Sequence, residues 1–95
     1  MDEGHTGEQL VADEPEHPTG DQVADWVTMY EKLITFTEAV LERTRVFMAE
    51  LHGAPKAHVE RTNVRIMEEE LSVFRGRLDV WRRRAKDDQE AATGF

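Results

Sequence analysis

The sequence predicts an all-α protein, built as a long antiparallel two-helix hairpin that dimerises into a four-helix bundle. Residues 21–52 and 56–86 both repeat apolar side chains at the heptad spacing of an amphipathic helix. Gly53-Ala54-Pro55 separates them, and glycine followed by proline is typical of the chain just past a helix end. On both helices the apolar arc is wider than the seam that one partner helix covers, which favours a second pair of helices.

The first predicted helix spans about residues 21–52. Thr19 and Gln22 have the spacing of a capping box, in which each residue satisfies a free backbone N–H of the other. Counted from Val23 as heptad position a, apolar residues fill positions a, d and e, while charged residues fall on the outer positions. This pattern indicates a helix with one broad apolar face.

The second predicted helix spans about residues 56–86. Its heptad positions a and d hold Val64, Met67, Leu71, Phe74, Leu78, Trp81 and Ala85. A short connection requires the two helices to run antiparallel. Residues whose numbers add to about 107 then lie level with each other, which places Trp26 beside Trp81.

The acidic charge lies in the ends of the chain. The net charge is −8, with seven acidic and no basic residues in 1–21, ten acidic and twelve basic residues in 22–86, and three acidic residues in 87–95. Residues 1–20 contain few sizeable apolar side chains, chiefly Leu10 and Val11, to offset the entropy of ordering. We therefore predict a disordered acidic N-terminal tail over residues 1–20 and a flexible C-terminal tail over residues 87–95.

Length and composition predict a single cytoplasmic domain. Ninety-five residues allow one domain, and the absence of cysteine excludes disulfides and thiolate metal sites. No stretch approaches the roughly 18 apolar residues of a membrane span. Residues 1–20 contain no lysine or arginine, which argues against a secretory signal.

The excess apolar surface predicts an interface between copies of the chain. A helix pair covers only its a and d positions, so apolar residues beside that seam would face water in an isolated hairpin. A homodimer is the simplest remedy, because two-fold dimers are the commonest oligomers. The predicted interface residues are Ile34, Phe36, Leu41, Val59, Ile66, Val73 and Val80.

Polar residues interrupt the apolar surface of the second predicted helix. Asn63, Glu70 and Arg77 repeat at heptad position g, and the register brings Thr37 level with Glu70. One interpretation is a pocket around Glu70 that binds a small molecule or a metal ion. We favour a polar core layer that fixes register and partner choice, as polar core residues do in coiled coils.

A basic cluster lies near the end of the second predicted helix. Its members are Arg75, Arg82, Arg83, Arg84 and Lys86. One interpretation is an anion patch for nucleic acid, a phosphorylated ligand or an acidic protein segment. We favour bases that complement the helix dipole and pair with neighbouring glutamates. The overall acidity and the lack of exposed aromatic residues for stacking argue against nucleic acid.

The sequence contains no arrangement that predicts catalysis or a cofactor. His52 and His58 flank the turn, but a zinc site needs three or four converging ligands. No phosphate-binding loop, nucleophile elbow or dinucleotide fingerprint is present. We therefore expect no enzyme, no cofactor and no metal. The predicted function is that of a non-enzymatic protein-interaction, regulatory or adaptor module acting as a homo-oligomeric helical bundle.

Overall fold

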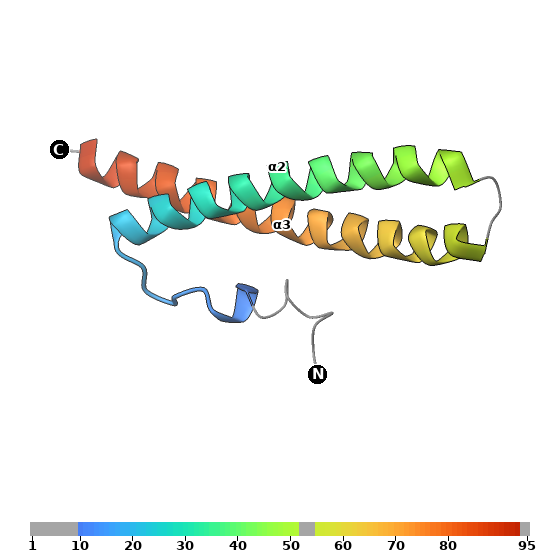
Figure 1. Cartoon of the computed structure of the whole chain (residues 1–95). Helices are drawn as coiled ribbons and strands as arrows, with labels where there is room; N and C mark the ends of the chain where they lie inside the picture. The colour runs from blue at the N-terminus through green and yellow to red at the C-terminus, as the bar shows by residue number, and fades with distance from the viewer. Residues whose placement is uncertain (1–9, 52–54, 94–95) are drawn as a thin grey trace.

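Two long antiparallel helices form the body of the protein (Figure 1). The computed structural model describes residues 10–51 and 55–93; the side chains at 51–60 and beyond 91 lie outside that description. Helix α2 spans Gly20–Leu51 and helix α3 spans Pro55–Thr93, and the two pack against each other lengthwise. Within the described ranges there is no strand. The all-α hairpin predicted from periodicity is confirmed.

The start of α2 is fixed by the predicted capping box. The backbone N–H of Thr19 donates to Gln22 Oε1 at 2.9 Å, and the backbone N–H of Gln22 donates to Thr19 Oγ1 at 3.2 Å. The carbonyl of Thr19 also accepts the N–H of Val23 at 3.0 Å. These bonds satisfy N–H groups that have no partner inside a helix, so α2 begins at a defined residue.

Helix α3 continues past Lys86 to Thr93. The prediction of a flexible tail is therefore wrong for residues 87–93. These residues include no glycine or proline, and Gln, Glu and Ala are good helix formers. Three acidic residues near a helix C-terminus are mildly unfavourable, but that cost is too small to end a helix that has already begun.

The register of the hairpin is marked by contacts along its length. The indole rings of Trp26 and Trp81 stack with their centroids 5.5 Å apart, as the predicted register requires. Three ion pairs spaced seven residues apart then follow one edge of the hairpin, and each side chain in them is about half exposed. Exposed pairs of this kind contribute only about 0–1 kcal/mol each, so they chiefly favour one register over its alternatives. The pairs are Glu31–Arg82 at 3.0 Å, Glu38–Arg75 at 2.6 Å and Arg45–Glu68 at 2.6 Å.

The buried core is concentrated at the open end of the hairpin, away from the turn. Tyr30 and Trp81 are fully buried there, in one cluster with Val23, Phe74 and Leu78. Nearer the turn, Leu41 and Leu71 are the buried apolar residues within the described part of the chain. The two halves of the hairpin therefore differ in how completely they cover their apolar surface.

We predict that Thr19→Ala lowers the free energy of unfolding by about 1 kcal/mol, because it removes the side-chain acceptor of the capping box. Thermal or urea denaturation measures the change. The matched control is Thr35→Ala at an exposed position inside α2, where alanine is the better helix former and should be neutral or slightly stabilising. Equal effects at the two positions would contradict a specific role for the cap.

Candidate functional site

The chain before α2 folds back along the hairpin and lies against it (Figure 1). We call residues 10–19 the strap. It begins with a helical turn at residues 10–12 and reaches α2 through an irregular segment. The predicted disorder of residues 1–20 is therefore wrong for residues 10–19, while residues 1–9 lie outside the described chain.

The strap is held first by an apolar contact. Leu10 packs against the buried cluster at the open end of the hairpin. The N–H of Asp13 donates to the carbonyl of Leu10 and the N–H of Glu14 to that of Val11, both at 3.2 Å. From this tight turn, Leu10 and Glu14, four residues apart, both reach the hairpin.

The second attachment is a carboxylate that both helices bind. The side chain of Glu14 is 7% exposed and forms an ion pair with Arg77 of α3. Arg77 Nε donates to Glu14 Oε2 at 3.1 Å and Arg77 Nη2 donates to Glu14 Oε1, so the guanidinium binds both carboxylate oxygens. The hydroxyl of Tyr30 in α2 donates to Glu14 Oε2 at 2.5 Å. Two-pronged arginine–carboxylate contacts are among the strongest hydrogen bonds in proteins. We call these three residues the anchor.

The anchor changes the acidity of its members. Burial by itself would raise the pKa of Glu14, but the hydrogen bonds from Arg77 and Tyr30 outweigh it and leave that pKa below its ordinary value. Burial and the nearby Glu14 carboxylate raise the pKa of Tyr30. The hydrogen bond to Glu14 raises the pKa of Arg77. The stable state is therefore a carboxylate, a neutral phenol and a guanidinium.

Two further donors lie on α3, four and seven residues past Arg77, without a partner in the described part of the chain. Trp81 Nε1 and Arg84 Nη1 are buried, and neither has a hydrogen-bond acceptor in the described part of the chain. The guanidinium of Arg84 lies over the Trp81 ring, 4.7 Å from its centroid. The indole N–H is close enough to help lower the pKa of Glu14, although it does not reach hydrogen-bonding geometry. The site thus offers more donors than the strap uses.

The predicted polar core layer is divided by the structure. Arg77 is bound to the strap, a partner that sequence periodicity did not indicate. Thr37 and Glu70 are half-buried, and Asn63 is exposed. The role of these residues in an oligomer core stays a prediction. No periodic pattern marked the strap, because Leu10 and Val11 are the only sizeable aliphatic side chains in residues 10–19.

The predicted anion patch is partly occupied by the chain's own groups. Arg75 and Arg82 pair with Glu38 and Glu31 of α2, and Arg84 is stacked on Trp81. Arg83 and Lys86 are exposed. Pairing of this kind is what the favoured interpretation of the cluster expects.

The predicted oligomer interface contains residues in three kinds of environment. Phe36 is 68% exposed, and Ile66 and Val73 are 43% and 44% exposed. Ile34 and Val80 are half-buried, and the side chain of Val59 lies outside the described residues. Leu41 is only 4% exposed within one chain, so the structure removes it from the available surface. Leu41 is at heptad position e of α2. The buried residues of this helix, Val23, Tyr30 and Leu41, occupy positions a and e, so position e faces α3.

Exposed apolar residues remain where the strap does not reach. Phe47, at 41% exposure, joins Phe36 on α2, while Ile66 and Val73 belong to α3. Heptad spacing puts these four residues on the side of the hairpin opposite the three ion pairs. We call them the distal surface. The strap covers the same side nearer the open end.

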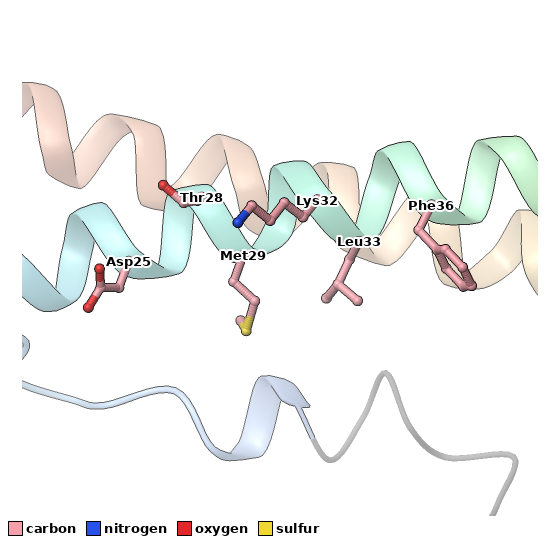
Figure 2. A pocket seen from close by; sticks show the side chains of 6 residues that line it. All are labelled: Asp25, Thr28, Met29, Lys32, Leu33 and Phe36. Carbon is pink, nitrogen blue, oxygen red and sulfur yellow. The ribbon is translucent and has the colours of Figure 1, made fainter.

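On α2, apolar side chains run from the part of the hairpin that the strap covers to the distal surface. A shallow hollow on α2 is lined by Asp25, Thr28, Met29, Lys32, Leu33 and Phe36. In Figure 2, Met29 and Leu33 point toward the side of α2 on which the strap lies, and Phe36 follows one turn further along the helix. Met29 and Leu33 pack at the edge of the buried cluster, whereas Phe36 is largely exposed. The transition from covered to uncovered apolar surface therefore lies near Phe36.

Neither a metal centre nor a membrane span is found in the described residues. Within 10–51 and 55–93, no three His, Cys, Asp or Glu side chains converge as metal ligands. In the same ranges, neither helix has a stretch apolar and long enough to cross a bilayer. The side chains of His52 and His58 lie outside the described residues.

Comparison with known proteins finds no matching family model, no matching curated protein and no matching solved structure.

We predict that Glu14→Gln lowers the free energy of unfolding by about 1–3 kcal/mol, because hydrogen bonds to a charged, buried group are lost while Arg77 keeps its charge. Urea denaturation followed by circular dichroism measures this change. The control is Glu16→Gln, an exposed position in the same strap, which removes the same charge and should change stability little. Equal effects would mean that Glu14 acts only through net charge.

We also predict a pH dependence of that difference. Because the pKa of Glu14 is lower in the folded than in the unfolded chain, its stabilisation is present above the unfolded value of about 4.3 and is lost as pH falls through the folded value. The stability gap between the wild type and Glu14→Gln should thus be constant from neutral pH to about pH 5 and should narrow progressively as the pH falls below about 4. A gap that does not narrow on acidification would contradict an ionised anchor.

Proposed function

We propose that the protein is a non-enzymatic interaction module of the cytoplasm in which two copies pair through the distal surface to form a four-helix bundle. The observation that carries this proposal is the exposure of Phe36, Phe47, Ile66 and Val73 on one side of the hairpin. Apolar side chains gathered on one face are typical of protein–protein contacts. A paired bundle could then serve as an adaptor for other proteins.

The thinness of the chain supports a second layer. The Cα atoms extend 63 × 28 × 15 Å, so the hairpin is one layer of helices over most of its length. Stable domains normally bury their apolar faces between two packed layers. The strap supplies part of a second layer at the open end, and a second copy would supply it near the turn.

The uncovered face is about the size of a small protein interface. At 1.5 Å per residue, residues 36–50 of α2 are about 22 Å long, and two helices side by side are about 20 Å wide. Such a face offers roughly 450 Å² on each copy, so two copies together come close to the roughly 1,000 Å² of a small specific interface. A smaller contact would favour a transient encounter instead.

The charge near the turn also permits self-association. Residues 33–50 and 61–73 contain six acidic and four basic residues, which gives a net charge of −2. Most of the acidic excess of the chain lies elsewhere, in its two ends. Two copies joined near the turn would therefore repel each other weakly despite the net charge of −8 for each.

We predict that the wild-type chain sediments as a dimer at micromolar concentration. Ile66→Glu combined with Val73→Glu should shift it to monomer, because each change puts a charge into an apolar contact. The matched control places two glutamates at exposed positions off the distal surface, Thr35→Glu with Ser72→Glu, and should remain dimeric. Circular dichroism checks that each variant is helical.

A wild-type chain that is monomeric and unfolds cooperatively would overturn the proposal. The same holds if both double variants dissociate equally, since net charge alone would then explain the effect.

A further inference from the structure

The strap occupies its site as a ligand occupies a receptor. It approaches from outside the hairpin, inserts one apolar side chain and one carboxylate, and is joined to α2 by a few residues. Tyr30 and Arg77, which bind the carboxylate, come from two different helices. Both residues belong to the hairpin, and the pairing of α2 with α3 places them side by side whether or not the strap is bound.

The strap is an incomplete occupant of this site. Trp81 Nε1 and Arg84 Nη1 remain buried without an acceptor in the described part of the chain. Buried donors without acceptors are penalised, and an occupant that supplies acceptors for them removes that penalty. A segment with a second carboxylate or carbonyl beside the first would fit the site better than the strap does.

The geometry points to a receptor for an acidic peptide segment of another protein, with the strap as a built-in competitor. The segment it fits has an apolar residue followed four positions later by a carboxylate, as Leu10 and Glu14 do in the strap. Its carboxylate takes the place of Glu14 between Tyr30 and Arg77, and a further acceptor meets Trp81 Nε1 or Arg84 Nη1. Arginine clusters commonly recognise acidic motifs in this way.

Competition from the strap makes the site autoinhibited. A tethered segment has a high effective concentration, so an outside peptide sees only the small fraction of molecules in which the strap is open. A partner must therefore either form more hydrogen bonds with the site than the strap does, or bind when the contact between the strap and the hairpin has been weakened. This inference goes beyond the proposed dimer, because the strap site and the distal surface are formed by different residues.

The test measures binding of a fluorescent peptide with the sequence of residues 8–19 to the full chain, by fluorescence anisotropy. Glu14→Gln in the full chain loosens the strap and should raise the affinity for the peptide at least tenfold over wild type. Glu16→Gln, the matched control, should bind as wild type does. A peptide with Gln in place of Glu14 should bind the opened chain at least tenfold more weakly.

Receptor variants are tested in the Glu14→Gln chain. Adding Arg77→Gln should abolish peptide binding, whereas Arg65→Gln, an exposed arginine of the same helix, should leave it unchanged. Tyr30→Phe keeps the buried ring and removes only the hydroxyl, so it reports on the site even if the Arg77 variant fails to fold.

Two results would overturn the inference. The first is equal peptide affinity, or none, for the wild type and for Glu14→Gln, since the strap would then not compete for a separable site. The second is peptide binding by the Glu14→Gln chain that Arg77→Gln leaves unchanged in a variant that still folds, since the peptide would then bind outside the strap site. The dimer at the distal surface is judged separately, by sedimentation of the Ile66→Glu, Val73→Glu variant.

Discussion

Two helices can cover only one seam of each other, and both helices of this chain carry apolar arcs wider than that seam. Every distinctive feature of the structure follows from how the remaining surface is covered. At the open end the strap supplies a third segment, and the most completely buried residues, Tyr30 and Trp81, lie there. Toward the turn no described segment of the chain covers the same side, and Phe36 and Phe47 stay exposed.

The covering of the open end depends on a polar contact. Leu10 alone adds little apolar area, so the strap needs the anchor to offset the entropy of ordering residues 10–19. A buried ion pair loses the solvation of both charges, and the two-pronged contact of Arg77 with Glu14, completed by the Tyr30 hydroxyl, compensates for that loss. Such a contact specifies where the segment docks more than it adds to stability. A contact that is specific but only marginally favourable is suited to reversible opening.

The two halves of one side of the hairpin therefore suit different kinds of contact. The distal surface is apolar and has nearby residues of both charge signs, which fits the proposed interface between like chains. The strap site is polar, has spare donors and already holds an acidic segment, which fits a replaceable peptide. The three exposed ion pairs favour the register of the two helices from the opposite edge. They therefore occupy neither the distal surface nor the strap site.

The sequence by itself determined the hairpin, its capping box and its register, because each depends on residues that are close in the chain or on a period repeated many times. Thr19 and Gln22 cap α2 through a three-residue spacing, and the Trp26–Trp81 stack follows once heptads are aligned about a short turn. The tertiary structure decided the docking of the strap, the burial of Leu41 and the partner of Arg77. The contact of Glu14 with Arg77 joins residues 63 positions apart and repeats nowhere else. Whether such a contact forms depends on a balance of desolvation, hydrogen bonding and ordering entropy, which has no periodic signature in the sequence.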